Sequence, residues 1–335
     1  MNIKYLAGRI VNMDIKNMFR AIDTVHERSG KNRVYIFFDM IHCGVKYGAG
    51  YSDYKLAEFY NLNRKQRATY ITRGINNRLV SLLNKKEDYY LVEDKRKFNE
   101  IFGDLIHREW LNMDTATQPE FEAFMAERSV IIAKPSDATC GKGIEKLDKK
   151  DFTSLQAMYT HLKETDAGLV EDCIIQHRDI AKLYPLSVNT LRIVTVYTEG
   201  EAHLIYAFIR IGNDGHFVDN FNSGGMVAPI DTEKGVIQYA AFDKQSCYYE
   251  THPYTGTPIA GSVIPFWKES VALCLTAAAR IPTLGYIGWD VAVTEDGPLL
   301  IEANQFPGHD ILQMPPHVPD KVGMLPKFKK YVKNL

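Results

Sequence analysis

Two acidic side chains near the C-terminal end of the sequence stand at positions that a β-hairpin would bring together. Asp290 and Glu302 lie in two apolar, β-like runs on either side of a turn at residues 295–297. If these three residues form the loop, with Gly297 in a left-handed conformation, Asp290 pairs with Glu302 across the hairpin. Asn304 then shares their face, because the side chains of a strand alternate with a period of two. The spacing therefore predicts three oxygen ligands on one face.

Facing carboxylates on an apolar sheet repel one another and lose hydration, so an uncompensated pair is costly. A divalent cation or a proton relieves the repulsion, and Mg²⁺ is suited because it binds through a few carboxylates together with phosphates. We therefore predict a Mg²⁺ site made of Asp290, Glu302 and Asn304. A register shifted by one residue would instead place Asp290 and Glu302 on opposite faces of the sheet.

A lysine at the end of an apolar run is the second candidate. Residues 131–134 form a β-like run that ends in Lys134 and enters a loop of small residues. Such a loop lets backbone N–H groups approach phosphate oxygens. The segment does not have the GxxxxGK[ST] spacing of a Walker A loop, nor does it satisfy GxGxxG. An ordinary hairpin turn with a solvated lysine is the competing interpretation.

Two arginines in the middle of the sequence form the third candidate. Arg192 lies within an apolar run, Arg210 lies in the next one, and Asn220 follows shortly before the pair Gly224-Gly225. A buried arginine needs an anionic partner. That partner is either an internal carboxylate or a bound anion, and the neighbouring candidates favour the bound anion.

The elements that must position these residues are short strands and a few helices. From residue 130 onward the sequence predicts strands at residues 130–134, 144–147, 169–176, 190–198 and 202–211. The last two form an antiparallel hairpin through Glu199-Gly200. Helices are predicted at residues 94–107, from Pro119, at residues 153–163 and at residues 267–280. Because residues 1–110 show mostly helical patterns, the fold class is α+β.

Composition excludes several classes of function. Of 335 residues, 45% are hydrophobic and 24% charged, and the net charge is −1, so no global basic field attracts nucleic acid or anionic lipid. The most apolar stretch, residues 271–281, contains Thr276 and Arg280 and is too short to span a membrane. No secretory signal is evident at the N-terminus. Five widely spaced cysteines without CxxC predict reduced thiols and a cytoplasmic protein.

The candidate residues, taken in order, resemble the ATP-grasp superfamily over about residues 92–310. The resemblance rests on Lys134 with its loop, Glu171, Arg192, Arg210, Asn220, Asp290 and Glu302-x-Asn304-x-x-Pro307-Gly308. The middle stretch looks like the RimK-type glutamate ligases. Asn189-Thr190-Leu191-Arg192 and the Tyr-rich N-terminal segment look more like the sugar-transfer-associated ATP-grasp group.

The resemblance implies an ATP-grasp fold, in which two α+β lobes clasp ATP, with a helix-rich region at the N-terminus. Lys134 would contact the phosphates under a loop lid, and Glu171 and the residues after it would form the hinge beside adenine. A second phosphate-binding lysine is Lys95 or Lys97. The implied cofactor-binding residues are Lys95, Ile132, Lys134, Ser136, Gly141, Lys142, Gly143, Glu171, Asp172, Cys173, Ile174 and Ile301; the metal ligands are Asp290, Glu302 and Asn304; the catalytic residues are Arg192, Arg210 and Asn220.

The implied activity is that of an ATP- and Mg²⁺-dependent carboxylate–amine ligase, a carbon–nitrogen bond-forming enzyme with an acyl-phosphate intermediate and small-molecule substrates. The subgroup suggests a cell-envelope sugar, polysaccharide precursor or secondary metabolite as acceptor. A kinase of the same fold and a catalytically silent nucleotide-binding protein are the alternatives. We predict a division into residues 1–110, 111–175 with the phosphate-binding loop, and 176–335 with the metal site. The first 90 residues lack a glycine-rich βαβ start, so substrate identity is expected to lie there.

Overall fold

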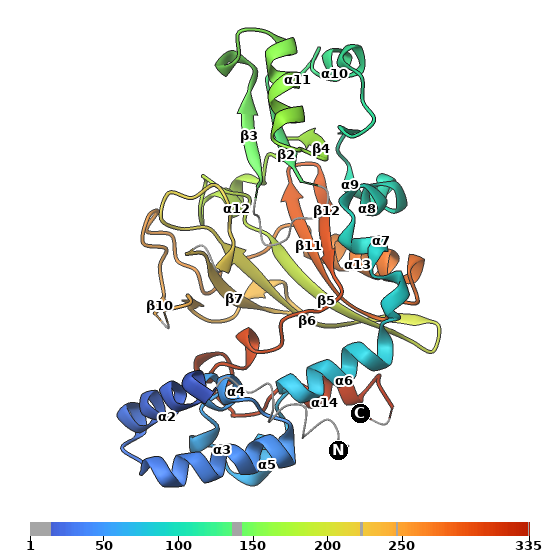
Figure 1. The fold of residues 1–335 in the computed structure, drawn as a ribbon. Helices are drawn as coiled ribbons and strands as arrows, with labels where there is room; N and C mark the ends of the chain where they lie inside the picture. The colour runs from blue at the N-terminus through green and yellow to red at the C-terminus, as the bar shows by residue number, and fades with distance from the viewer. Residues whose placement is uncertain (1–14, 136–142, 222–223, 246, 334) are drawn as a thin grey trace. The chain divides into compact units, whose positions relative to one another are not determined.

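The computed structural model describes residues 15–135, 143–221, 224–245, 247–333 and 335 (Figure 1). Its internal contacts divide the chain into two compact units. Met1–Leu82 and Gly308–Leu335 form the first, which we call the helical unit. Leu83–Pro307 form the second, which we call the sheet unit. The three-part division predicted at residues 110 and 175 stays a prediction.

The helical unit contains α-helices and 3₁₀-helices throughout its described residues, as the sequence predicted for the N-terminal region. Its elements are α2 (Ile15–Ser29), α3 (Arg33–Tyr47), α4 (Tyr51–Leu56), η1 (Phe59–Asn61), α5 (Arg64–Arg67), α6 (Arg73–Leu83), η5 (Ile311–Gln313), η6 (Pro315–His317) and α14 (Leu325–Lys329). Its core packs Val25 of α2 against Ile36 and Met40 of α3, with Tyr54 and Phe59 beneath them. The tail after residue 307 contains η5 and η6 and belongs to this unit.

Helix α3 has a clear start and a clear end. The Asn32 side chain accepts a hydrogen bond from the backbone N–H of Val34, which satisfies one of the unpaired donors of the first turn. Gly48 ends the helix with a φ of 68°, and its backbone N–H donates to the carbonyl of Cys43. The helix between these caps therefore has a fixed rotation, and its inner and outer faces are well defined.

The sheet unit begins with short helices and a four-stranded antiparallel sheet, which we call the small sheet. The helical elements are η2 (Lys86–Asp88), α7 (Tyr90–Glu93), α8 (Lys95–Ile101), α9 (Gly103–Ile106), α10 (Gln118–Phe124), η3 (Lys149–Asp151) and α11 (Leu155–Glu164). The strands are β1 (Trp110–Asn112), β2 (Val130–Lys134), β3 (Glu145–Asp148) and β4 (Leu169–Asp172), in the order β1-β4-β2-β3. Phe121 of α10 and Met158 of α11 pack on Ile131 and Val170 of the sheet. Figure 1 shows α11 running alongside β2 and β3.

The second sheet, which we call the large sheet, has eight strands. They are β5 (Leu191–Thr198), β6 (Glu201–Ile211), β7 (Met226–Asp231), β8 (Val236–Ile237), β9 (Ala241–Phe242), β10 (Tyr248–Tyr249), β11 (Tyr286–Thr294) and β12 (Gly297–Asn304), in the order β10-β9-β7-β6-β5-β11-β12, with β8 beside β7. The helix α12 (Arg178–Ala181) precedes them, and α13 (Trp267–Arg280) packs on the sheet. Ile193, Trp289 and Val291 point into the core that contains α13.

The α+β class predicted from sequence is confirmed, and so are most of the predicted elements. The strand at residues 130–134 and the helix at residues 267–280 have the predicted bounds. The helix predicted at residues 94–107 is broken in two, because Phe102 leaves the helical conformation between α8 and α9. The strand predicted at residues 169–176 ends at Asp172.

No helix among the described residues is long and apolar enough to cross a membrane.

Candidate active site

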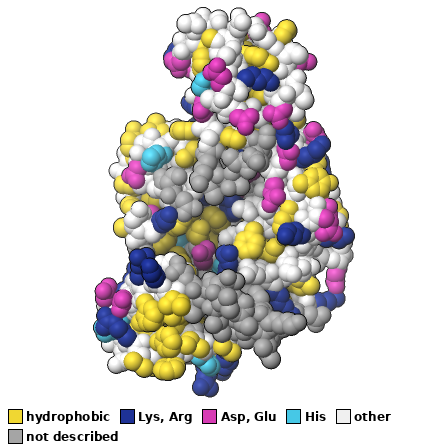
Figure 2. Space-filling model, viewed as in Figure 1, with side chains coloured by type: hydrophobic (Ala, Val, Ile, Leu, Met, Phe, Trp, Pro, Cys, Tyr) yellow, Lys and Arg dark blue, Asp and Glu magenta, His cyan; other side chains and the backbone are white. Residues whose placement is uncertain are grey.

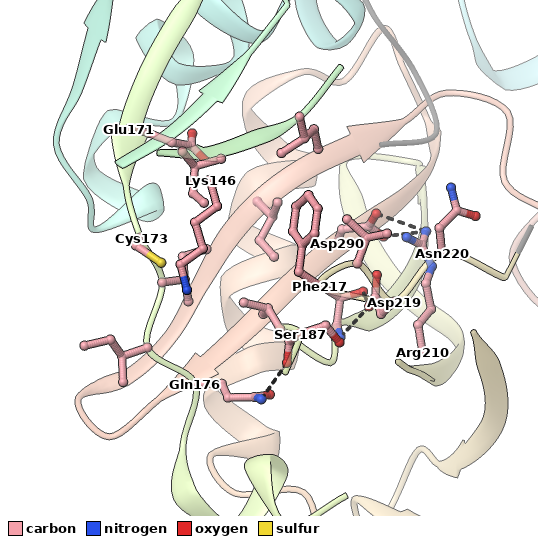
Figure 3. Close-up of a pocket in the computed structure, with 18 of the residues that line it drawn as sticks. Lys146, Glu171, Cys173, Gln176, Ser187, Arg210, Phe217, Asp219, Asn220 and Asp290 are labelled. Atoms are coloured by element: carbon pink, nitrogen blue, oxygen red, sulfur yellow. Dashed lines mark hydrogen bonds and ion pairs between the residues drawn. The ribbon is translucent and has the colours of Figure 1, made fainter. Parts of the chain in front are cut away.

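A cavity of about 440 Å³ in the sheet unit takes its walls from both sheets (Figure 3). Ile132 and Lys134 of β2 and Glu171 of β4 line it from the small sheet. Arg210 of β6 and Asp290 of β11 line it from the large sheet. Residues predicted to bind a nucleotide and residues predicted to bind a metal therefore surround one space.

The hairpin of β11 and β12 pairs Asp290 with Glu302, as the sequence predicted. The reason differs from the predicted one. Glu295 and Asp296 form a two-residue turn, and the extra residue lies in the strand: Asp290 pairs with Glu302 but Val291 pairs with Leu300, which leaves Ile301 as a β-bulge. Side chains normally alternate along a strand, but next to this bulge the consecutive residues Ile301 and Glu302 both line the cavity.

Register also places the two predicted arginines on the face that carries Asp290. Arg192 of β5 lies directly opposite Asp290, and Arg192 pairs on its other side with Phe208 of β6. Arg210 follows Phe208 by two residues and so shares its face. Gly288 keeps this face open, since a Cβ there would lie 2.9 Å from Cδ of Arg192.

Both arginines form ion pairs with Asp290. Arg192 donates to both carboxylate oxygens, with Nη2 at 3.1 Å from Oδ2. Nη2 of Arg210 lies 3.0 Å from the same Oδ2 (Figure 3). The internal-carboxylate interpretation of these arginines is therefore the one observed in this structure, and the carboxylate is one of the predicted metal ligands.

Glu302 is the acidic residue that these cations leave uncompensated. Burial among the cavity walls and then the nearby Asp290 carboxylate raise the pKa of Glu302 to about 7, against the opposing effects of Arg210 and Lys134. Glu302 is nonetheless an exposed residue, so water screens much of this effect. Burial also raises the pKa of Asp290, although Arg210 lowers it in part, so both acids of this pair bind a proton more tightly than free carboxyls do.

The oxygen donors at this end of the cavity fit Mg²⁺ chemically. Asp290, Glu302 and Asn304 offer carboxylate and amide oxygens, which hard cations prefer, and a divalent cation would replace the proton on Glu302. Asn304 pairs with Gly288, two residues along the hairpin from the pair of Asp290 and Glu302. It does not line the cavity, and its Oδ1 accepts a hydrogen bond from the backbone N–H of Phe306 at 2.8 Å. Among the described residues, no cluster of three or more His, Cys, Asp or Glu side chains is placed to hold a metal ion.

The opposite end of the cavity holds a second buried ion cluster. Glu171 lies between the ammonium of Lys134 and the guanidinium of Arg108, whose Nε is 3.1 Å from Oε2 of Glu171. Burial acts to raise the pKa of Glu171, but Arg108 and Lys134 outweigh it and hold the pKa below its ordinary value. Two cations therefore face one carboxylate here, which leaves this end with an excess of positive charge.

The segment after β4, which the sequence predicted to be the hinge, also lines the cavity. Asp172, Cys173 and Ile174 are all part of its wall. The Asp172 carboxylate itself accepts hydrogen bonds from Nε of Arg128 at 2.6 Å and from the backbone N–H of Glu109 at 2.9 Å. Hydrogen bonds therefore hold the Asp172 side chain in place, and the residues that follow it line the cavity.

A buried aspartate and an asparagine complete the end near Arg210. Asp219 accepts hydrogen bonds from both the backbone N–H and the hydroxyl of Thr190, at 2.8 and 2.5 Å. Burial raises the pKa of Asp219, although Arg210 lowers it in part. Asn220, predicted as catalytic, lines the cavity beside Arg210 and Asp290 (Figure 3).

The remaining predicted residues divide into three groups. Lys95 and Ile301 line the cavity, whereas Lys97 forms a surface ion pair with Glu100 at 2.7 Å. Gly143 lies outside the cavity wall with a φ of 70°. Three predicted residues lie outside the described part of the chain: Ser136, Gly141 and Lys142.

Sequence reasoning missed Arg108, Lys146 and Phe217. Lys146 follows Ile144 by two residues, and both line the cavity, so the period of a strand could have identified the lysine. Arg108 stands in a short connection between α9 and β1, and Phe217 stands in a loop. Neither of these two positions carries a periodic signal in the sequence.

The chain was compared with known families, sequences and structures. A family model described as sugar-transfer associated ATP-grasp matches residues 74–327. No curated protein sequence matches the chain. Similar solved structures include an ATP-grasp ligase PsnB complexed with precursor peptide PsnA2 and AMPPNP, with 16% identity, a TM-score of 0.40, and coverage of 70% of this chain and 58% of that chain.

Two further solved structures have similar scores. The D-alanine–D-alanine ligase from Bacillus anthracis has 15% identity and a TM-score of 0.41, with coverage of 76% of this chain and 72% of that one. The D-cycloserine synthetase DcsG has 10% identity and a TM-score of 0.43, with coverage of 76% of each chain. At such values these similarities carry no argument about substrate.

Proposed function

The chain belongs to the sugar-transfer-associated ATP-grasp family, and on that premise we propose that it is an ATP- and Mg²⁺-dependent carboxylate–amine ligase. One observation supports the proposal most. A single cavity has an excess of positive charge at the Lys134 end and a carboxylate pair at the Asp290 end. A nucleoside triphosphate with its cation needs both the positive charge and the carboxylates, because its phosphates are anionic and its metal prefers oxygen ligands.

The small-sheet end of the cavity would bind the nucleotide. Ile132 and Ile301 offer apolar surface to an adenine ring, one from each sheet. Backbone groups of Cys173 and Ile174 would meet the edge of the ring, where they supply directional hydrogen bonds. Lys134 and Lys95 would contact the phosphates, since both line the same cavity. The loop with Ser136, Gly141, Lys142 and Gly143 would cover them, as the family resemblance implied.

The large-sheet end would bind the cation through Asp290, Glu302 and Asn304. When bound, Mg²⁺ would act as a Lewis acid that neutralises charge on the phosphates. Glu302 would lose its proton on binding, since a carboxylate must be ionised to act as a ligand. Asp290 already has its two oxygens oriented by Arg192 and Arg210, so its position is fixed before any ligand enters.

Arg210 and Asn220 would orient the donor carboxylate and the acyl phosphate formed from it. Both line the cavity, and fixed hydrogen-bond donors bind phosphoryl oxygens more strongly as charge develops. Arg192, the third residue predicted as catalytic, is buried behind Asp290, and we propose that it positions this carboxylate. An amine would then attack the acyl phosphate and release phosphate.

The acceptor remains at the level of a class: an amine on a sugar, a polysaccharide precursor or a secondary metabolite, with a small-molecule carboxylate as donor. The cytoplasm, predicted from the cysteines, is the proposed compartment. A division into an N-terminal helical region, a lobe with the phosphate loop and a lobe with the metal site accompanies this proposal.

Isothermal titration calorimetry with a non-hydrolysable ATP analogue tests the nucleotide site, with and without Mg²⁺. We expect Mg²⁺-dependent binding that is lost in Lys134→Ala and in the double variant Glu302→Ala/Asn304→Ala. Lys97→Ala is the matched control, because Lys97 pairs with Glu100 at the surface, away from the cavity wall. A folded wild-type chain that binds no nucleotide would overturn the proposal.

The chemistry is tested separately by following products from a panel of acids and amines. Release of ADP and phosphate with formation of an amide supports the ligase. A stable phosphorylated product without an amide would instead assign the chain as a kinase. Nucleotide binding without any turnover across the panel would favour the catalytically silent alternative.

A further inference from the structure

Helix α3 of the helical unit exposes a stripe of large apolar side chains. Val34, Phe38, Ile41 and Val45 are all exposed, and their spacing of four, three and four residues places them on one face of the helix. Phe38 alone is 63% exposed. A helix on the surface of a globular protein normally presents polar residues on its outer face. The outer face of α3 is therefore unusual and calls for a partner.

The inner face of the same helix is already satisfied. Ile36, Met40 and Cys43 are buried in the core of the helical unit. The one acidic residue of α3, Asp39, is paired with Arg67, with Nη2 at 2.7 Å from Oδ2. The exposed part of α3 thus carries apolar side chains, a histidine and the basic residues Arg33 and Lys46. Arg33 is paired with the exposed Asp23 of α2, with Nε 2.7 Å from Oδ1.

Helix α2, which packs against α3, also exposes apolar side chains. Ile15 and Phe19 are exposed on α2, next in sequence to the exposed Lys16 and Arg20. We call the exposed apolar residues of the two helices the α2–α3 face. Figure 2 shows hydrophobic side chains gathered over the helical unit, with Lys and Arg side chains around them.

The charge of the helical unit is strongly positive. Residues 1–82 and 308–335 contain 19 Lys and Arg against 8 Asp and Glu, a net charge of +11. Residues 83–307 contain 21 Lys and Arg against 33 Asp and Glu, a net charge of −12. The net charge of −1 for the whole chain, from which we predicted no basic field, is the near-cancellation of these two values. The helical unit does have such a field.

We propose that the α2–α3 face docks on a lipid bilayer that contains anionic headgroups. Lys and Arg side chains gain energy near such a surface, and apolar side chains such as Phe38 and Ile41 gain energy when they enter the boundary between headgroups and acyl chains. A nucleic acid would use the charge but would leave the apolar stripe in water. A second copy of the same face would bury the stripe but would bring two strongly positive units together.

This face is independent of the proposed ligase site. Residues 15–67, which form α2 to α5, precede the range that matches the family model. Docking and catalysis can therefore fail separately, and each has its own measurement. A membrane-bound acceptor would be presented to the enzyme at the surface on which the helical unit docks.

Co-sedimentation of the full-length chain with vesicles tests the proposal. The vesicles are made of phosphatidylcholine alone or of phosphatidylcholine with phosphatidylglycerol. We expect the wild-type chain to bind the anionic vesicles, and to bind them more weakly as salt rises. The partition coefficient of Phe38→Glu should be lower than that of the wild type by about tenfold or more, because a charged side chain cannot enter the boundary region. Phe38→Trp should retain binding.

Val263→Glu is the matched control for Phe38→Glu. Val263 is 65% exposed, lies in the sheet unit, and the change in net charge is the same. We expect Val263→Glu to bind vesicles as the wild type does, and both variants to keep the wild-type thermal unfolding curve. Equal loss in both variants would show a non-specific charge effect and would overturn the proposal.

Three other outcomes also overturn it. The first is a wild-type chain that does not sediment with anionic vesicles. The second is salt-dependent binding to a DNA duplex that Phe38→Glu leaves unchanged, which would assign the basic field to nucleic acid. The third is a wild-type dimer, seen by sedimentation velocity, that Phe38→Glu converts to a monomer in the absence of vesicle binding.

Discussion

Each unit of the molecule has a buried cluster of aspartate and arginine, and the two clusters differ in what remains uncompensated. In the helical unit, Arg67 donates to both oxygens of Asp39 at 2.7 Å, and the hydroxyl of Tyr54 donates to Oδ2 at 2.7 Å. Burial acts to raise the pKa of Asp39, but these partners outweigh it and the pKa lies below its ordinary value. This cluster is charge-balanced and closed.

The cluster in the sheet unit adds a second acid. Two arginines hold Asp290, and Glu302 stands opposite with a pKa raised to about 7. Asp290 and Glu302 also line the cavity of about 440 Å³, whereas Asp39 and Arg67 do not. An ion pair between an arginine and an aspartate therefore has a structural role when no further charged group accompanies it. An extra acid at the wall of a cavity distinguishes the cluster at which we propose that a cation binds.

The largest expected effect is that of Asp290→Asn. Without this carboxylate, the proposed cation would lose a ligand, and Arg192 and Arg210 would lose their ion-pair partner. We expect turnover to fall by about a hundred- to thousandfold, since fixed charges at a reacting phosphate have effects of this size. ADP release under saturating Mg²⁺ is the measurement. Turnover within a few-fold of the wild-type value would show that the Asp290 cluster, like the Asp39 cluster, has only a structural role.

Asp39→Asn should affect folding but not ligand binding. The change leaves the buried Arg67 without its anion, and removal of one partner from a buried pair costs about 3–5 kcal/mol. Urea denaturation gives the free energy of unfolding. Calorimetry at a temperature where the variant is folded should give wild-type nucleotide binding, and weaker Mg²⁺-dependent binding would show that this cluster is not only structural.

Gly288→Ala perturbs the sheet cluster without removing a charge. The new Cβ would lie 2.9 Å from Cδ of Arg192, so that the arginine must move away from Asp290. We expect a loss of about 1–3 kcal/mol in unfolding free energy, typical of overpacking, together with a weaker response of nucleotide binding to Mg²⁺. Gly103→Ala is the control, because its Cβ meets no atom within 4 Å.

The smallest expected effect is a pH dependence that belongs to one cluster only. The pKa of Glu302 is near 4.5 in the unfolded chain and about 7 in the folded chain, so the folded chain binds more protons than the unfolded chain between these pH values. Stability without Mg²⁺ should therefore fall as pH rises through this window, and saturating Mg²⁺ should reduce the fall. Thermal unfolding at a series of pH values measures this. Glu302→Gln should flatten the curve, and an unchanged slope would contradict it.

The sequence predicted the pairing of Asp290 with Glu302 but not the bulge that produces it. Alternation and turn residues indicate which strands pair, whereas a bulge at Ile301 shifts the register without a residue type that announces it. The arginines were ambiguous for a similar reason. A sequence shows that Arg192 is buried and needs an anion, but only the register of three strands shows that the anion is Asp290.

Elements with a strong local pattern were predicted well, and short ones were not. The helix at residues 267–280 and the strand at residues 130–134 have clear apolar periodicity or a continuous apolar run. Strands β8, β9 and β10 have two residues each, too few for a pattern, and were not predicted. The basic field was missed because a total over the whole chain averages two units of opposite charge.

Arg108 has a consequence for how the cavity can change its volume. Its Nε pairs with Glu171 of the small sheet, while its two terminal nitrogens donate to the carbonyls of Leu300 and Ile301, at the bulge of the large sheet. One side chain therefore links the two sheets through its contacts with Glu171 and Ile301, two residues that line the cavity. A hinge motion that opens the cavity must either break these contacts of Arg108 or rotate about them. If the contacts persist, the displacement is smallest at Arg108 and increases toward β3, at the far edge of the small sheet.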